Sequence, residues 1–111
     1  MVAFTIPIEV ADPNFPQGVK TIEETHIFHV GGFDHDTKKL QVSGACYSIE
    51  NNTWREDVPA LNKDRKECYA CQQGNYVYIF AGVSSSGDTN TIEKLNAKSF
   101  LDGQQPSWIL I

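Results

Sequence analysis

Residues 27–33 read IFHVGGF, a run of bulky residues that ends on two adjacent glycines. Glycine weakens a strand and contributes no side chain, so a Gly-Gly pair at this place indicates a sharp bend or a close backbone approach. Fifty residues later the chain reads VYIFAGV, with Ala81-Gly82 in the same place. The recurrence of one pattern at this spacing predicts a repeat architecture.

Strand signals dominate the surrounding sequence. Short stretches rich in β-branched or aromatic residues occupy 25–30, 42–49, 67–73 and 76–80, and polar clusters with Gly and Asn separate them. The nearest approach to a helical pattern is 90–103, NTIEKLNAKSFLDG, although its TIEKL also alternates as a strand does. We therefore predict an all-β fold.

The size and charge of the chain restrict its class. The 111 residues suffice for one ordinary domain. Nine Lys and Arg against fourteen Asp and Glu give a net charge of −5, which argues against nucleic acid or an anionic membrane as the main partner. The first residues lack a secretory pattern, and no apolar run approaches the length of a transmembrane segment. Three cysteines, an odd number, fit free thiols, so we expect a cytoplasmic protein.

The two halves of the chain share further landmarks. In the first half, Tyr47 precedes Trp54 by seven residues. In the second half, Leu95 stands where the tyrosine stood, and Trp108 follows it after thirteen residues. A six-residue insertion before the second tryptophan accounts for the longer spacing.

Together these landmarks resemble the kelch repeat. The first copy covers 27–65 and the second covers 66–111, while residues 1–26 form an N-terminal segment. The motif residues are Gly31, Gly32, Tyr47, Trp54, Pro59 and Arg65 in the first copy, and Gly82 and Trp108 in the second. The second copy departs from the pattern at Ala81 and Leu95.

The resemblance implies two four-stranded antiparallel blades of a β-propeller. The first strand of the first blade would come from AFTIPI, residues 3–8, and Tyr47 and Trp54 would pack across neighbouring strands. Propellers close with about four to eight blades, and a blade buries its faces only against its neighbours. We therefore expect a fragment of a longer propeller, a homo-oligomer that closes a ring, or a subunit of a larger assembly.

Two residue pairs have the spacing of metal ligands. They are His26 with His29 and Cys68 with Cys71. Residues three apart on a strand point to opposite faces, so neither pair can chelate from one regular strand. We predict buried thiols and ordinary strand histidines, with no metal or cofactor.

Two loops carry polar residues that could act in catalysis or in ligand binding. The sequence DHD at 34–36 combines two carboxylates with an imidazole, which suits acid–base chemistry or weak binding of a divalent cation. The sequence SSSGDTN at 84–90 lacks the glycine spacing and the lysine of a phosphate-binding loop. We favour partner-facing or solvated loops in both places.

In an up-and-down blade, the 33–41 loop, the 84–90 loop and the connector, residues 56–66, emerge on one face. Loops on a rigid scaffold commonly carry recognition. The residues predicted to meet a protein partner there are Asp34, His35, Asp36, Lys38, Lys39, Arg55, Ser85 and Asp88.

The resemblance implies a non-enzymatic protein–protein interaction module or scaffold, as in ubiquitin-ligase adaptors and cytoskeletal binders. Two alternatives stay open. The chain could belong to a kelch-type enzyme, such as an oxidase or a sugar-acid isomerase, or it could be a permanent structural subunit of a large complex.

Overall fold

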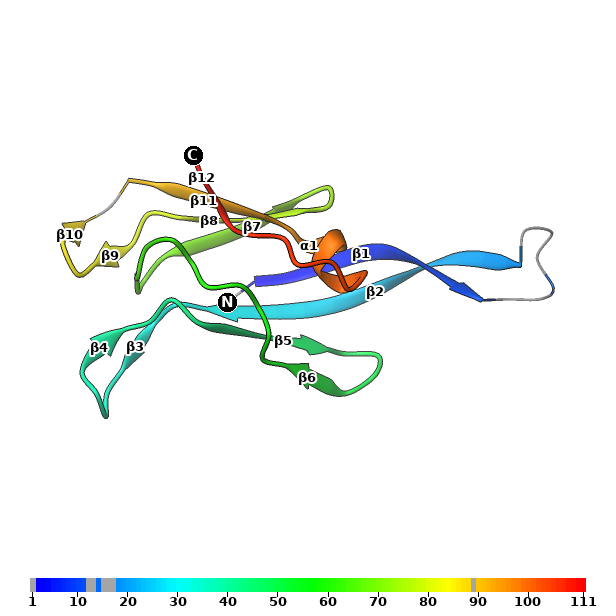
Figure 1. Ribbon diagram of the computed structural model, residues 1–111, viewed down its shortest axis with the longest axis horizontal. Coiled ribbons are helices and arrows are strands. Elements are labelled where there is room, and N and C mark those ends of the chain that lie inside the picture. Colours follow the sequence, from blue (N-terminus) through cyan, green and yellow to red (C-terminus); the bar gives the residue numbers. More distant parts are fainter. Residues whose placement is uncertain (1, 12–13, 15–17, 89) are drawn as a thin grey trace.

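The computed structural model describes residues 2–11, 14, 18–88 and 90–111, and antiparallel strands dominate them (Figure 1). The predicted all-β class is confirmed. The longer strands are β1 (Val2–Ala11), β2 (Val19–Val30), β5 (Gly44–Ser48), β6 (Thr53–Arg55), β7 (Tyr69–Gln73), β8 (Tyr76–Phe80) and β11 (Ile92–Asn96). The short elements are β3 (Phe33–Asp34), β4 (Lys39–Leu40), β9 (Val83–Ser84), β10 (Gly87–Asp88), α1 (Ala97–Leu101) and β12 (Ile109–Leu110).

The first sheet has the strand order β1-β2-β5-β6. Its longest hairpin pairs β1 with β2 over ten residues, from Val2 opposite Phe28 to Ala11 opposite Val19. The stretch AFTIPI therefore lies beside β2, and Pro7 is tolerated because β1 is an edge strand. The far end of this hairpin extends well beyond the rest of the molecule (Figure 1).

The second sheet has the strand order β12-β11-β8-β7 and is antiparallel throughout. The ambiguous segment 90–103 contains both predicted alternatives in succession, since β11 ends at Asn96 and α1 begins at Ala97. The Asn96 side chain accepts a hydrogen bond from the Ser99 N–H at 3.0 Å and thereby caps the helix. Five residues long, α1 is the helix of the described part of the chain, and it is too short to cross a membrane.

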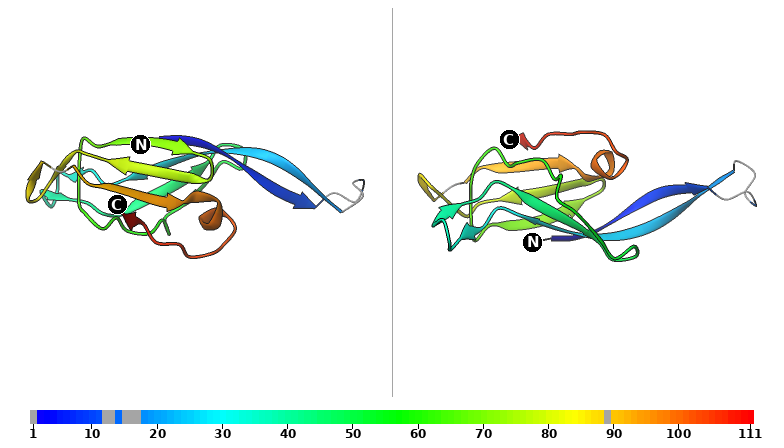
Figure 2. Two further views of the ribbon diagram at one scale, coloured as in Figure 1. Left: turned by 90° about the horizontal axis from the view of Figure 1, so that it is seen from above. Right: turned by 60° about the horizontal axis from the view of Figure 1, so that its bottom comes forward.

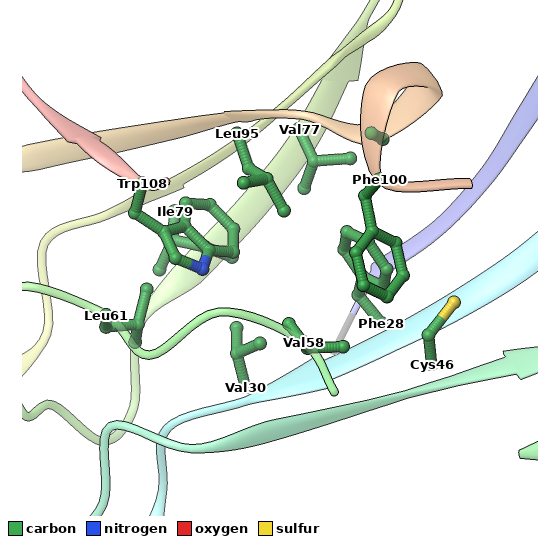
Figure 3. Packing of buried hydrophobic residues seen from close by; sticks show 11 residues of the cluster. Phe28, Val30, Cys46, Val58, Leu61, Val77, Ile79, Leu95, Phe100 and Trp108 are labelled. Atoms are coloured by element: carbon green, nitrogen blue, oxygen red, sulfur yellow. The ribbon is translucent and has the colours of Figure 1, made fainter. Parts of the chain in front are cut away.

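The hydrophobic core lies between the two sheets. Figure 3 shows Phe28, Val30 and Cys46 of the first sheet across from side chains of the second sheet. The Phe100 ring of α1 meets Phe28 edge-on at 5.6 Å between centroids. The buried hydrophobic residues are Phe28, Val30, Cys46, Val58, Leu61, Val77, Ile79, Leu95, Ala97, Phe100 and Trp108.

The connector closes one side of this core. Its Val58 and Leu61 are buried between the sheets, and the Leu61 N–H donates to the Val42 carbonyl at 2.9 Å. The first glycine of the pair, Gly31, has a φ of +72°, and a Cβ at this position would lie 2.7 Å from the carbonyl oxygen of Arg65. Both the positive φ and the close approach of the connector therefore require glycine there.

One predicted strand start and one predicted burial are wrong. The strand expected at 25–30 begins at Val19, because it pairs along its whole length with β1, and the division between residues 26 and 27 falls inside it. The prediction of buried thiols is wrong for Cys71, which is exposed because it lies on the outer face of β7.

Candidate functional site

The β3–β4 hairpin holds most of the predicted partner-binding residues. Asp34 organises its turn, since one carboxylate oxygen accepts hydrogen bonds from the N–H groups of Asp36 at 2.9 Å and Thr37 at 3.3 Å. These backbone donors, the Asp36 N–H first, lower the pKa of Asp34 below its usual value. The His35 ring stands edge-on to Phe33 at 5.0 Å between centroids. Asp34 and His35 thus have contacts within the hairpin.

Two lysines occupy the tip and the return strand of the same hairpin. Lys38 and Lys39 are exposed, and Lys38 has a φ of +57°. The Lys38 N–H donates to the Asp34 carbonyl at 2.7 Å, which fixes the backbone while leaving the ammonium group in solvent. The hairpin therefore presents positive charge beside the carboxylate of Asp36.

The β9–β10 hairpin lies at the same end of the molecule as the β3–β4 hairpin (Figure 2). The backbone N–H and the hydroxyl of Ser85 both donate to a carboxylate oxygen of Asp64, at 3.0 and 3.1 Å. Asp64 belongs to the connector, so the hairpin and the connector are joined. Asp88 lies in β10, and its side chain is outside the described part of the structure.

The connector also reaches the other hairpin, because the Lys66 ammonium group lies 5.3 Å from the centroid of the Phe33 ring. We call the two hairpins together with residues 62–66 the loop surface. A shallow pocket of about 340 Å³ opens in it, lined by Val42 and by residues 62–64 and 84–86. The two hairpins and residues 62–66 therefore lie together, whereas Val58 and Leu61 of the predicted connector lie in the core.

Arg55 does not join the loop surface. Its guanidinium carbon lies 4.1 Å from the centroid of the Phe100 ring, and Nη1 donates to the Phe100 carbonyl at 3.3 Å. Nη2 and Nε donate to the Asp57 carboxylate at 2.8 and 3.0 Å, and these hydrogen bonds raise the pKa of Arg55. The sequence prediction failed here because Phe100 is 45 residues away in the chain.

The predicted contact of Tyr47 with Trp54 is present. The two residues are direct cross-strand partners, with ring centroids 4.9 Å apart, and the Tyr47 hydroxyl donates to the Asn52 side chain. Trp54 is nevertheless 64% exposed, whereas Trp108 is 4% exposed and donates from Nε1 to the Pro59 carbonyl at 2.8 Å. The connector covers one tryptophan and leaves the other open.

Sequence reasoning missed Glu93, the buried partner of Arg65. The two form an ion pair at 2.8 Å, and both side chains are fully buried. Glu93 also accepts hydrogen bonds from the backbone N–H groups of Asn62 and Lys63, at 2.6 and 3.1 Å. A signal was present, since Glu93 alternates with Leu95 on the buried face of its strand, and a buried acid requires a partner.

A second pocket, of about 310 Å³, opens between the first sheet and α1. His26, Cys46 and Ser48 are buried in its wall. Burial raises the pKa of the Cys46 thiol to about 12, although the nearby Arg55 charge opposes the shift, so the sulfur is a neutral thiol near pH 7.

The two pairs with metal-ligand spacing, for which the sequence predicts no metal, differ in the exposure of their members. His26 is buried in this second pocket, while His29 is exposed and lines a pocket on the opposite face of the first sheet. Cys68 is half-buried and Cys71 exposed. Among the described residues, no three His, Cys, Asp or Glu side chains gather in a way that suits a metal ion.

Comparison with known proteins gives no assignment. The sequence matches no protein-family model, and a search of curated proteins found no match.

Proposed function

We propose that the chain is a non-enzymatic, cytoplasmic protein–protein interaction module built from two kelch-type β-propeller blades. One observation carries the proposal: two consecutive four-stranded antiparallel sheets send the hairpins that follow residues 31–32 and 81–82 to the same end of the molecule. The strand order of each sheet follows an up-and-down path, as in a propeller blade.

The loop surface is the proposed binding site for a protein partner. Its contacts with the connector hold the two hairpins on the scaffold, which reduces the entropy that binding would otherwise cost. Its exposed groups carry both signs of charge, from Lys38 and Lys39 to Asp36. Such a surface suits a partner with complementary charges.

The test is a capture experiment with charge-removing variants. Asp34 and Ser85 hold the surface together, so the variant of choice is Lys38→Gln/Lys39→Gln. Capture of partners from a cell extract should fall several-fold while the thermal midpoint stays unchanged. A matched control, Gln104→Glu/Gln105→Glu, shifts the net charge by the same amount in an exposed loop elsewhere. Equal capture by all three proteins would contradict the proposal.

A permanent structural role is the second candidate, favoured by exposed apolar side chains on the outer sheet faces. Trp54 is 64% exposed, Tyr69 67% and Ile109 51%. Faces of this kind mark contacts with further blades, in a longer chain, a homo-oligomer or a larger assembly. Light scattering on a size-exclusion column distinguishes these cases: a discrete oligomer supports self-assembly, and a monomer indicates that other chains or segments cover the faces.

A further inference from the structure

The two sheets carry corresponding residues at corresponding places. After β2, the N–H of Gly31 donates to the Ser43 carbonyl at 2.9 Å, and after β8 the N–H of Ala81 donates to the Thr91 carbonyl at 3.3 Å. Gly31 and Ala81 both have a positive φ, +72° and +62°. Ser43 of the first sheet therefore corresponds to Thr91 of the second.

In the second sheet, Arg65 of the connector fills this place. Its guanidinium donates to the carbonyls of Ala81 and Thr91, both at 3.1 Å, and to the Thr91 hydroxyl at 3.0 Å. A further bond of 2.8 Å reaches Glu93, two residues along the strand. The Arg65 side chain is fully buried by these contacts.

In the first sheet, the corresponding place is an open pocket of about 540 Å³. Gly31 and Ser43 line it, and serine offers a hydroxyl as threonine does in the second sheet. Ala45, two residues after Ser43, corresponds to Glu93 and has no carboxylate. The residues that correspond to Ala81 and Thr91 thus line the pocket, and the acid is missing at the one position that corresponds to Glu93. Asp34 lines the pocket as well.

Glu56 supplies a carboxylate from the neighbouring strand. The register of β5 with β6, extended by one residue, places Glu56 opposite Ala45, and both residues line the pocket. In the second sheet, Glu93 stands opposite Leu110. The acid thus lies on the inner strand in the second sheet and beside the outer strand in the first, with the uncharged residue opposite it in each case. Because opposing Cβ atoms lie only about 4.5–5.5 Å apart, a carboxylate on either strand serves the same space.

The exposed tryptophan of the first sheet belongs to the same face as this pocket. Trp54 and Glu56 are two residues apart on an extended chain and point to the same side. Two of the connector's contacts with the second sheet involve its proline and its arginine: the Pro59 carbonyl accepts a hydrogen bond from Trp108, and the Arg65 side chain donates one to Glu93. A segment with the same spacing of proline and arginine would make both contacts with the first sheet.

We infer that the outer face of the first sheet binds an arginine-bearing segment of a partner protein that resembles the connector. The guanidinium lies between Ser43 and Glu56, and the proline lies against Trp54. The chain's own Arg65 is not the ligand, because the second sheet buries it completely. This pocket adjoins the loop surface, because Phe33 and Asp34 of the β3–β4 hairpin also line it. The inference rests on Ser43, Glu56 and Trp54 and not on Lys38 or Lys39, so it goes beyond the proposed function and does not need it.

The test uses a fluorescein-labelled peptide with the sequence of residues 57–66, DVPALNKDRK, and measures its polarisation as the full chain is added. We expect saturable binding. The Glu56→Gln chain should bind the peptide at least about tenfold more weakly, because the bidentate ionic contact between the carboxylate and the peptide's guanidinium is lost. A peptide with lysine in place of its arginine should bind more weakly by a similar factor, since lysine cannot form the forked contact.

The control is Glu23→Gln, which removes the same charge from an exposed position in the first half of β2, away from the pocket residues at its end. Its affinity should stay within about twofold of the unaltered chain, because exposed charges at that distance are screened by salt. Equal weakening by Glu23→Gln and Glu56→Gln would overturn the inference, as would the absence of saturable binding at millimolar peptide. Either result leaves capture of partners through the loop surface unaffected.

A third variant tests the exchange between strands. Ala45→Glu/Glu56→Leu moves the carboxylate to the strand position that it has in the second sheet. We expect the affinity for the peptide to recover to within about threefold of the unaltered chain. Circular dichroism verifies that the variant is folded, and a folded variant that binds no better than Glu56→Gln would contradict the shared-space argument.

Discussion

Arg65 and Glu93 join the two sheets through an ion pair of 2.8 Å from which solvent is excluded. Arg65 follows the first sheet in the chain, and Glu93 lies in the middle of the second. The carbonyl of Arg65 also accepts a hydrogen bond from the Gly32 N–H at 2.7 Å. One residue therefore bonds through its backbone to the glycine pair that follows β2 and through its side chain to the second sheet.

Removal of one member of this pair should destabilise the fold strongly. Arg65→Met leaves the Glu93 carboxylate buried without its partner, and such a change costs about 3–5 kcal/mol. The measurement is the free energy of unfolding in urea. As a control, Lys98→Met breaks the exposed pair of Lys98 with Asp102 and should cost no more than about 0.5 kcal/mol. Similar losses for both variants would show that the buried pair contributes little.

The two tryptophans should respond differently to the same substitution. Trp108→Phe removes the donor to the Pro59 carbonyl from a buried site and should cost about 1–3 kcal/mol. Trp54→Phe keeps a ring against Tyr47 and changes mainly solvent contacts, so its cost should stay below about 0.5 kcal/mol. Thermal and urea unfolding of both variants check this. A larger loss for Trp54→Phe would mean that the isolated chain buries Trp54.

The parts of the fold that sequence alone predicted depend on local signals. The alternation of YVYIF predicts β8, and the glycines that follow β2 and β8 predict the turns there. These signals suffice for the all-β class, because each of them acts within a few residues. The length of β2 could not be predicted in this way, since it depends on pairing with β1. Arg55 was misplaced for the same reason: its position depends on Phe100, which reaches it only after the two sheets have packed together.

Glycine at position 31 should be needed for more than its backbone angle. Gly31→Ala places a Cβ against the Arg65 carbonyl, whereas Gly74→Ala places alanine at a similar positive φ, +60°, with no atom within 4 Å of the new Cβ. The Gly74 variant should lose about 1 kcal/mol from backbone strain alone. Gly31→Ala should lose clearly more than the Gly74 variant in urea unfolding. Equal losses would show that the connector moves aside at no cost.

The buried thiol of Cys46 should make stability depend on pH in the alkaline range. Because burial raises its folded-state pKa to about 12, the folded chain keeps a proton that the unfolded chain loses near the ordinary thiol value of about 8.5. The resulting stabilisation is fully present below that ordinary value and is lost as pH rises towards 12.

The Cys46→Ala variant isolates this contribution. Other groups titrate above pH 9 as well, so the quantity to measure is the difference in unfolding free energy between the unaltered chain and the variant, from pH 7 to pH 11. That difference should shrink as pH rises, because only the unaltered chain loses the stabilisation that comes from the raised pKa of Cys46. Near pH 7.5, a disulfide reagent should modify exposed Cys71 rapidly and Cys46 only when the chain unfolds. A difference that stays constant with pH, together with rapid modification of Cys46, would mean that the core between the sheets admits solvent.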